Sequence, residues 1–388
     1  MNRKDFLKMC GILGVGIPFQ STLTSCNSGE GLSPSNIGKV IIIGAGAGGL
    51  TAGYLLNQRG IEFEILEASS THGGRMRTTR DFADFPISLG GEWLHVEKGV
   101  LSEIVNDPSI QIDVETTPYD LELDYGLFEG QQITVQDVGF TIDQKFIGSS
   151  WFDFYEEYVV PSVRSKISYN TIIDSIDYSS DQIRVRTADQ EFIADRVIVA
   201  VPVKILQNGA ITFTPELPAD KRDAITNVTV WDGCKAFIEF SQKFYPTFVA
   251  FDIQPESAGQ KLYYDAAYGQ NTNQNILGLF AVGTGTLPYV QLSDSQLIDY
   301  MLAELDDIFD GQASSSYVKH IFQNWNEEPF ANGAYIYDNE DWRRVRKLGE
   351  SISGKLYFAG DAYTTGDDWS SVHAAARSAK RAIEELVS

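Results

Sequence analysis

"VIIIGAGAGGLTAGYLLNQRGIEFEILEAS" occupies residues 40–69 and decides the fold of the chain. The apolar run Val40–Ile43 predicts a buried strand, residues 50–58 predict an amphipathic helix, and Phe63–Leu66 predicts a second strand that leads to Glu67. Glycines at three positions between the first strand and the helix permit a tight turn, close approach of a pyrophosphate and close helix–strand packing: Gly44, Gly46 and Gly49. The stretch therefore predicts a dinucleotide-binding βαβ unit, with the phosphates at the helix N-terminus and Glu67 on the ribose hydroxyls. The alternative is a glycine-rich turn in a Rossmann-like unit that holds no nucleotide.

The bulk composition describes an ordinary soluble chain with an acidic surface. Its 388 residues are enough for two domains, and 43% of them are hydrophobic. A net charge of −23 argues against nucleic acid as a partner, because phosphate backbones attract basic surfaces. The acidity serves either solubility or the attraction of cationic substrates.

The N-terminus has the anatomy of a signal peptide. "MNRKDFLKMCGILGVGIPFQSTLTSC" has a basic start, a short apolar middle and small residues before Cys26. "LTSC" resembles a bacterial lipoprotein box, in which cleavage frees Cys26 for acylation, and "NRKDFLK" resembles a twin-arginine export signal with Lys4 at the second arginine. We expect an exported bacterial lipoprotein, periplasmic or membrane-anchored, that touches the membrane only through a lipid at Cys26. The alternative is an uncleaved, disordered tail. Of the three cysteines (Cys10, Cys26 and Cys234), the mature chain then keeps no pair for an internal disulfide framework.

The dinucleotide-domain pattern recurs in the middle and at the end of the chain. Strands are expected in "DRVIVAVP" and "LYFAG", and a terminal helix is expected from Ser371 to Leu386; helices are also expected at "WFDFYEEYVV" and at Asp294–Ile308, and further strands at "CKAFIEF" and "NILGLFAVG". The predicted fold class is α/β, a Rossmann-like FAD-binding domain interrupted by a mixed-sheet α+β substrate domain. A Rossmann-like domain interrupted twice points to a flavoprotein. The predicted segments are a signal peptide (1–26), a flexible tether (27–37), the FAD-binding domain (38–96, 165–215 and 340–388) and the substrate domain (97–164 and 216–339).

Five segments resemble the flavin-containing amine oxidases, a family of monoamine oxidases, polyamine oxidases and histone demethylases. They are the opening fingerprint, "GGRMRT" at 73–78, "LGGEWLH" at 89–95, "CKAFIEFSQKFYP" at 234–246, and a C-terminal pair, "WNEEPFANGAYIY" at 325–337 with "LYFAGDAYTTGDDWSSVHAAARSA" at 356–379. The resemblance implies FAD as the cofactor and adds these cofactor-binding residues to the fingerprint: Gly74, Arg75, Ile173, Trp325, Gly360, Asp361 and Val372. Asp361 departs from the family, which mostly has glutamate there.

The same resemblance implies the catalytic residues. Lys235 matches the lysine that holds a water against flavin N5, and its alternative is a lysine at a strand edge in solvent. Tyr335 falls on one wall of an aromatic cage whose second wall aligns with Ser371. His95 falls on an active-site position of polyamine oxidases, where it meets the substrate amine; its alternative is a structural histidine bonded to backbone. Glu92 either adds negative charge for a cationic substrate or is a carboxylate at the rim. Ala334 stands where some monoamine oxidases carry a cysteine bonded to FAD, so non-covalent FAD is expected.

The resemblance implies an enzyme that oxidises the C–N bond of a small-molecule amine by hydride transfer to flavin N5, with O2 as oxidant and hydrogen peroxide as product. No metal site is predicted. Two alternatives stay open. One is an FAD-dependent desaturase or oxidase of an apolar CH–CH substrate, of carotenoid or protoporphyrinogen type, whose C-terminal acid is often aspartate like Asp361. The other is a non-enzymatic FAD-bearing binding or scaffold lipoprotein.

Overall fold

A computed structural model describes residues 37–119, 125–129, 132–136 and 143–388. The predicted signal peptide, which includes Cys26, and the predicted tether up to residue 36 lie outside these residues. The described chain divides into two units. The Rossmann unit comprises residues 37–74, 155–228 and 340–388, and the sheet unit comprises the described part of 75–154 together with 229–339. Each unit is described by itself.

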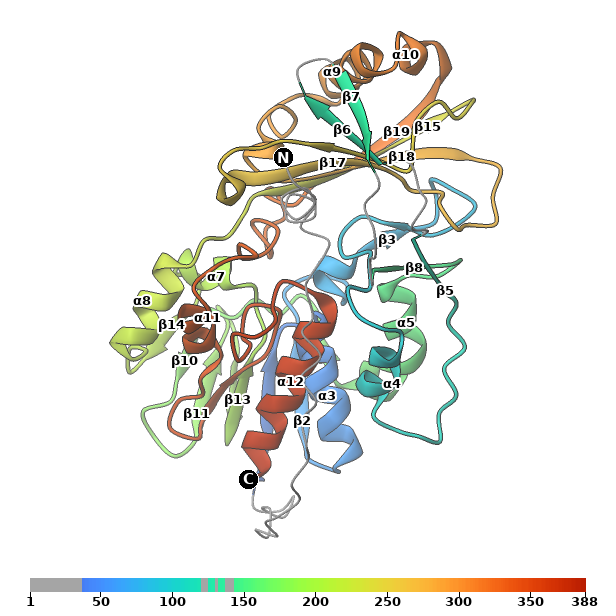
Figure 1. The fold of residues 1–388 in the computed structure, drawn as a ribbon. Coiled ribbons are helices and arrows are strands. Elements are labelled where there is room, and N and C mark those ends of the chain that lie inside the picture. Colours follow the sequence, from blue (N-terminus) through green and yellow to red (C-terminus); the bar gives the residue numbers. More distant parts are fainter. Residues whose placement is uncertain (1–36, 120–124, 130–131, 137–142) are drawn as a thin grey trace. The chain divides into compact units, whose positions relative to one another are not determined.

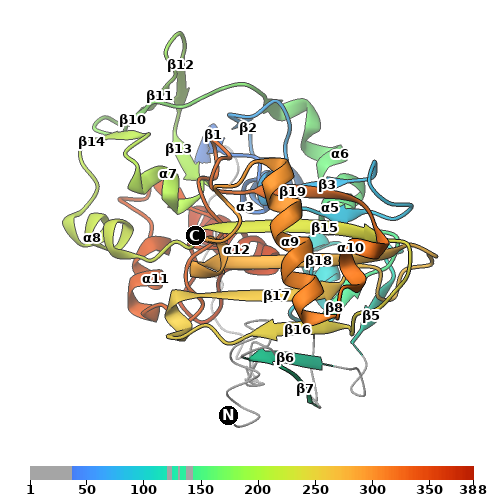
Figure 2. The same cartoon turned by 90° about the horizontal axis from the view of Figure 1, so that it is seen from above.

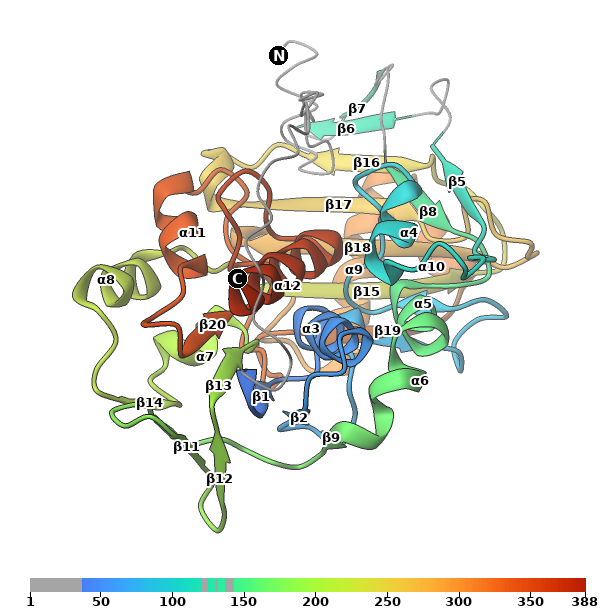
Figure 3. The same ribbon diagram turned by 90° about the horizontal axis from the view of Figure 1, so that it is seen from below.

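A five-stranded parallel sheet forms the centre of the Rossmann unit. Its order is β20–β13–β1–β2–β9, with Val40 aligned to both Arg196 and Phe63. Strand β1 has all four residues buried, because a parallel sheet is covered on both faces. Figures 1 and 3 show α3 and α12 side by side, and the two helices pack against each other. The strands of this sheet and the two helices are β1 (Val40–Ile43), α3 (Ala47–Gln58), β2 (Phe63–Leu66), β9 (Ile167–Ser168), β13 (Arg196–Val199), β20 (Leu356–Phe358) and α12 (Val372–Val387).

A second, four-stranded sheet of the Rossmann unit has the order β12–β11–β10–β14. Strands β11 and β12 pair antiparallel, and Ile183 and Val185 on β11 are both buried. The remaining elements of the unit are α6 (Val160–Val163), β10 (Ser175–Asp177), β11 (Ile183–Arg186), β12 (Glu191–Ala194), α7 (Val203–Gln207), β14 (Thr212–Thr214), α8 (Ala219–Asn227) and α11 (Trp342–Gly349), while α5 (Trp151–Tyr158) crosses from one unit to the other.

The sheet unit contains a seven-stranded mixed sheet of order β19–β15–β18–β17–β16–β6–β7. Only the β16–β6 pair is parallel. The elements of the unit are β3 (Thr78–Thr79), β4 (Ile87–Ser88), α4 (Gly99–Val105), β5 (Thr116–Pro118), β6 (Tyr125–Glu129), β7 (Gln132–Gln136), β8 (Gln144–Phe146), β15 (Gly233–Phe240), β16 (Phe248–Phe251), β17 (Gly259–Asp265), β18 (Asn275–Gly283), α9 (Asp294–Ile308), α10 (Gln312–Ser316) and β19 (Tyr317–Asn324). Short 3-10 turns occur at Gly74–Met76, Arg164–Lys166, Glu256–Ala258 and Thr284–Thr286.

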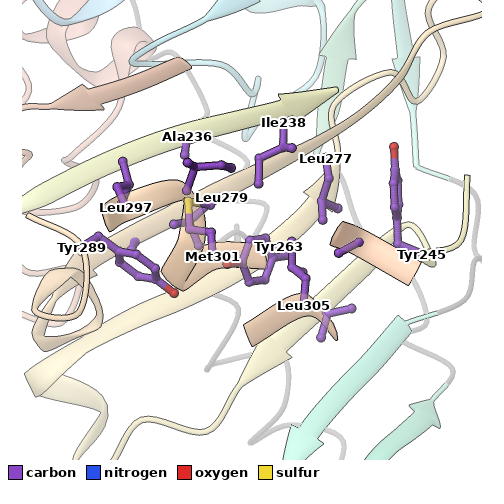
Figure 4. Packing of buried hydrophobic residues seen from close by; sticks show 14 of the residues in the cluster. Ala236, Ile238, Tyr245, Tyr263, Leu277, Leu279, Tyr289, Leu297, Met301 and Leu305 are labelled. Atoms are coloured by element: carbon purple, nitrogen blue, oxygen red, sulfur yellow. The ribbon is translucent and has the colours of Figure 1, made fainter. Parts of the chain in front are cut away.

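Helix α9 covers one face of this sheet (Figure 2). Figure 4 shows Ala236 and Ile238 of β15 in the same cluster as Met301 and Leu305 of α9. Because side chains alternate along a strand, Lys235 and Phe237 point to the opposite face, where Phe237 joins a second core cluster with Tyr264 and Trp93. One face of the sheet at β15 therefore packs against α9, and the opposite face carries the buried ammonium group of Lys235.

The unit boundaries differ from the sequence-based domain limits at three places. Residues 75–96 lie in the sheet unit, and residues 155–164 and 216–228 lie in the Rossmann unit. The first segment is tied to the sheet unit by backbone bonds, such as the Leu94–Gln144 bridge. The other two follow helix packing, because α6 packs on α3 and α8 packs on α11. The boundary between 339 and 340 coincides in both divisions.

Candidate active site

The glycine turn after β1 has the backbone geometry that the fingerprint requires. Gly44 has a φ of +102°, which a residue with a Cβ rarely adopts, and its N–H donates to the Leu66 carbonyl at 2.8 Å. A Cβ on Gly49 would lie 1.9 Å from the Gly44 carbonyl oxygen, so only glycine lets α3 start this close to β1. The turn therefore directs the first N–H groups of α3 into the space ahead of the helix.

That space forms a cradle around Gly46. Apart from its chain neighbours, no heavy atom of the described residues lies within 4 Å of a Cβ built on Gly46, and a Cβ on Gly74 would lie 3.4 Å from the Gly46 Cα. The second glycine segment is held there by the Gly73 N–H, which donates to the Ala45 carbonyl at 2.8 Å. Helix α3 has no acidic residue in its first turn and no side-chain cap. An open, glycine-lined helix N-terminus of this kind suits a pyrophosphate.

Glu67 follows β2 and lies beside this cradle. Its carboxylate accepts hydrogen bonds from the Ala45 N–H at 2.6 Å and from the Ser69 N–H at 2.8 Å, one on each oxygen. A carboxylate has about four acceptor positions, so it retains capacity for ribose hydroxyls. The Glu67 carbonyl also accepts from the Thr171 N–H at 2.8 Å, which brings the loop with buried Ile173 next to the acid.

The C-terminal motif contributes a turn and a helix N-terminus to the Rossmann unit. Gly360 follows β20, and the Asp361 carbonyl accepts from the Ser370 N–H at 3.1 Å. Ser371 is the N-cap of α12, and its side chain accepts from the Ala374 N–H at 3.1 Å. Val372 is therefore the first residue of α12, where a backbone N–H and the helix dipole favour negative charge. Capping the helix explains why a small hydroxyl residue occupies position 371.

Three of the recognised segments, 73–78, 89–95 and 325–337, meet within the sheet unit. The Arg75 guanidinium donates to the Ala334 carbonyl, and the Arg75 carbonyl accepts from the Gly91 N–H at 2.9 Å. The Trp325 indole donates to the Leu89 carbonyl at 2.9 Å. Segments far apart in sequence, from 75, 89–91, 325 and 334, are thus bonded to one another.

Tyr335 lies half-buried beside an aromatic partner that the sequence did not reveal. The rings of Tyr335 and Trp231 pack edge to face, with centroids 5.9 Å apart at 65°. The backbone N–H of Trp231 donates to the Tyr335 carbonyl at 2.9 Å, and the backbone N–H of Ala334 donates to the Trp231 carbonyl at 2.8 Å. Strand β15 starts two residues later, so the tyrosine is fixed to the strand that carries Lys235.

Lys235 is buried in the middle of the sheet, between β18 and β19, and not at a solvent edge. Its ammonium group donates to the Ser88 carbonyl at 3.0 Å, the Gly90 carbonyl at 3.1 Å and Glu92 Oε2 at 2.6 Å. A protonated lysine has three N–H donors, so a water on Nζ would replace one of these acceptors. Burial lowers the pKa of Lys235, and the Glu92 carboxylate opposes this effect.

Glu92 is neither a rim carboxylate nor a group open to a substrate, because its side chain is only 6% exposed. Burial raises its pKa, but the ammonium groups of Lys235 and Lys145 lower it more, and the net pKa lies below the usual value. The Tyr264 hydroxyl also donates to Glu92 Oε2 at 2.6 Å.

His95 lies beside a buried carboxylate. Its Nδ1 lies 3.2 Å from Asp143 Oδ1, and its side chain is 30% exposed. A second acid, Asp338, influences both His95 and Tyr335. Burial raises the pKa of Asp338 to about 7, although the Gln260 amide donates to it at 3.4 Å.

The sequence motifs do not identify five residues of the site: Trp231, Asp143, Lys145, Tyr264 and Asp338. Each lies outside a recognisable motif, and each reaches the site through strand pairing or loop packing.

The strand that contains Lys235 also contains the buried Cys234, whose thiol pKa burial raises to about 12. Within the described ranges, no cluster of three or more His, Cys, Asp or Glu side chains is arranged to hold a metal. None of the helices in these ranges is both long and apolar enough to cross a membrane.

Comparison with known proteins decides the family. The profile of "Flavin containing amine oxidoreductase" matches residues 155–387, which is more than half of the chain. The chain belongs to the flavin-containing amine oxidoreductases. A profile of the "NAD(P)-binding Rossmann-like domain" matches residues 42–107 and covers the glycine turn. The cofactor of this flavin-containing amine oxidoreductase is FAD, and the cradle at Gly46 with the acid at Glu67 fits that dinucleotide.

Relatives and solved structures agree with this assignment. Lysine-specific histone demethylase 1B of Mus musculus is 23% identical over 92% of this chain and 53% of its own length. Polyamine oxidase 2 of Arabidopsis thaliana is 22% identical over 89% of this chain and 87% of its own length. The structure of wild-type putrescine oxidase bound to putrescine shares the fold, with a TM-score of 0.73, 15% identity, and coverage of 90% of this chain and 99% of that one. The oxidoreductase thus spans about half the length of the first curated relative but nearly all of the polyamine and putrescine oxidases.

Proposed function

We propose that the chain is an FAD-dependent oxidase of a small-molecule amine, with O2 as the electron acceptor. One observation carries the proposal: in the sheet unit the family's segments bond to one another around a buried lysine on β15. The named activities of the relatives support the substrate class, because a polyamine oxidase and a putrescine-bound oxidase match almost over their full lengths. We infer non-covalent FAD, because Ala334 has no thiol with which to form a thioether.

The overall reaction converts an amine, O2 and water into a carbonyl compound, ammonia or a smaller amine, and hydrogen peroxide. Bound FAD supplies the acceptor for the hydride that leaves the carbon next to the nitrogen, and O2 takes the two electrons on. The amine must be neutral for its lone pair to assist that loss, so the protein has to favour the free base. An apolar wall does so, because desolvation disfavours the ammonium form.

Tyr335 and Trp231 form such a wall, and their edge-to-face packing fixes its shape. Asp338 adds a carboxyl group that accepts or releases a proton close to neutral pH, because burial raises its pKa to about 7. His95, beside Asp143, adds an imidazole that hydrogen-bonds the amine in this proposal. Glu67 and the glycine cradle of the Rossmann unit hold the cofactor's ribose and pyrophosphate. In this proposal Lys235 has the role that the family resemblance implies, which is to hold a water against flavin N5.

The test is an anaerobic stopped-flow screen of the yellow protein with monoamines, polyamines and L-amino acids, followed at the flavin absorbance. An amine that bleaches the flavin, followed by peroxide release on aeration, supports the proposal. Lys235→Met should slow flavin turnover by orders of magnitude and leave FAD bound, whereas Lys98→Met, at an exposed lysine of the same unit, should not. Bleaching by an apolar polyene alone would favour the desaturase alternative, and a flavin that neither class reduces would favour the binding or scaffold lipoprotein.

We also propose that the chain is exported and anchored by a lipid at Cys26. The support is the sequence of residues 1–26, with its basic start, apolar middle and "LTSC" end. Cells that express the chain should incorporate labelled palmitate into it and retain it with membranes. Cys26→Ser should abolish both, and an unlabelled, freely released wild-type chain would refute the anchor.

A further inference from the structure

A buried charge cluster surrounds Lys235 in the sheet unit, and we call Glu92, Lys145, Lys235 and Tyr264 the Glu92 cluster. Lys235 lies on β15, Tyr264 on β17 and Lys145 on β8, while Glu92 follows β4. All four are buried, with Tyr264 fully inaccessible. Ion pairs of this depth are uncommon, because removing charges from water is costly unless geometry and hydrogen bonds compensate.

Hydrogen bonds define the position of the Lys235 ammonium. Glu92 Oε2 accepts from Lys235 Nζ at 2.6 Å and from the Tyr264 hydroxyl at 2.6 Å, while Oε1 lies 3.5 Å from Lys145 Nζ. The Trp93 ring centroid lies 4.9 Å from Lys235 Nζ and supplies a cation–π contact. Nζ is therefore held by a carboxylate, two carbonyls and a ring, and the carboxylate is the one charged acceptor among these contacts.

Burial lowers the pKa of Lys235, and two neighbours change it further, since Lys235 and Lys145 share one carboxylate. Glu92 favours the protonated form of Lys235, whereas Lys145 disfavours it. Lys145 donates to the Ala266 carbonyl and is also attracted by Asp265, which itself pairs with Lys243 at 2.6 Å. Loss of Glu92 and loss of Lys145 should therefore move the proton affinity of Lys235 in opposite directions.

We propose that Glu92 is a positioning residue for Lys235, which fixes its ammonium group and keeps it protonated while the flavin is reoxidised. The proposal rests on the oxidase function proposed above. Glu92 itself need not touch FAD or amine. Its effect passes through Lys235, so it requires that Lys235 be present.

The experiment reduces the holoenzyme flavin with dithionite, mixes it with O2, and records the reoxidation rate from pH 6 to 10. Glu92→Gln should move the midpoint of the pH profile at least one unit lower, and Lys145→Met should move it higher. Glu92→Asp should recover part of the shift. Glu92→Gln/Lys235→Met should match Lys235→Met alone, because the effect passes through the lysine.

A second measurement needs no flavin. In the apoprotein, Glu92→Gln should steepen the rise of unfolding free energy with pH, because loss of the carboxylate lowers the pKa of the buried lysine further below that of the unfolded state. The added slope should be absent from the double variant. If Glu92→Gln does not fold, the double variant and Glu92→Asp still test the coupling, since removing both partners of a buried pair is milder than removing one.

The outcomes are distinct. Superimposable pH profiles of Glu92→Gln and wild type, or equal shifts in Glu92→Gln with and without Lys235, would overturn the proposal. Because dithionite replaces the amine, the result does not depend on which substrate reduces the flavin. Failure of the proposed function would appear separately, as a flavin that no amine bleaches.

Discussion

A Cβ atom on Gly233 would lie 2.5 Å from the Cβ atom of Ala334, so these residues can face each other only while the first has no side chain. The contact joins the start of β15 to the segment that carries Tyr335. It explains in steric terms why "DGCK" at 232–235 and "NGAY" at 332–335 approach so closely. The geometry of the aromatic wall thus depends on a missing methyl group.

Gly233→Ala should destabilise the protein by about 1–3 kcal/mol, the usual range for an added group in a packed site. It should also raise KM for the amine, because Ala334 must shift and Tyr335 follows it. Chemical denaturation and steady-state kinetics measure the two effects. Ala334→Gly in the same chain should restore much of the stability. Gly99→Ala is the control, since a Cβ there would lie more than 4 Å from every described atom outside its own helix turn.

Gly46→Val should abolish FAD retention and leave the fold intact. The described residues leave the space around a Cβ at Gly46 open, so we expect the valine side chain to fit the apoprotein and to fill the cradle that we assign to the pyrophosphate. The affinity for FAD, measured by flavin fluorescence quenching, should fall more than tenfold, while the circular dichroism spectrum of the apoprotein stays unchanged. Unaltered FAD binding in this variant would remove the cradle from the cofactor site. Gly49→Ala should instead disrupt folding, because its Cβ would collide with the Gly44 carbonyl.

Local patterns predicted much of the fold. Strand β18 and helix α9 have the expected limits, Asn275–Gly283 and Asp294–Ile308. Both were predictable because the hydrophobic pattern of a strand or helix depends only on residues close together in sequence. The βαβ unit also formed as expected, with α3 starting at Ala47, three residues before the apolar stretch that predicted it. The glycines before Leu50 have no hydrophobic period, which is why the pattern began late.

Local sequence patterns could not predict which residues contact the site residues. The burial of Lys235 follows from an apolar strand around it, but its pairing with Glu92 depends on a loop 143 residues away in sequence. The contact between His95 and Asp143 likewise depends on packing across 48 residues. A sequence motif records residue type and spacing, whereas these contacts are created by which strands become neighbours.

Lys221 should make the stability of the Rossmann unit depend on pH. Its ammonium donates to the carbonyls of Leu348 at 2.8 Å and Glu350 at 2.6 Å, at the C-terminus of α11, and lies 3.5 Å from the Phe358 ring centroid. Burial lowers its pKa from 10.5 to about 7, so the unfolded state binds more protons between these values. The stability that this group contributes should therefore rise as pH increases from about 7 to about 10.

Lys221→Met should remove that slope and cost about 1–3 kcal/mol, because the buried carbonyls at the end of α11 lose their hydrogen-bond donor. Urea unfolding of wild type and variant at several pH values measures the difference between the slopes. The exposed Lys166→Met serves as the control in the same unit. Parallel stability curves for wild type and Lys221→Met would contradict the assigned titration.

Asp338 should act in the opposite sense. Burial raises its pKa from 3.8 to about 7, so the folded state holds a proton that the unfolded state has already released. Its favourable contribution is complete at low pH and is lost as pH rises through about 7. Asp338→Asn does not titrate, so the stability of the variant relative to wild type should increase between pH 4 and pH 8. Each pKa unit corresponds to about 1.4 kcal/mol, which limits the change to about 4 kcal/mol.

Urea unfolding of Asp338→Asn and wild type at each pH measures this change, because the contributions of the other carboxylates are the same in both proteins. The exposed Asp81→Asn should show no such trend. A constant difference between Asp338→Asn and wild type across this range would show that Asp338 ionises normally in the fold.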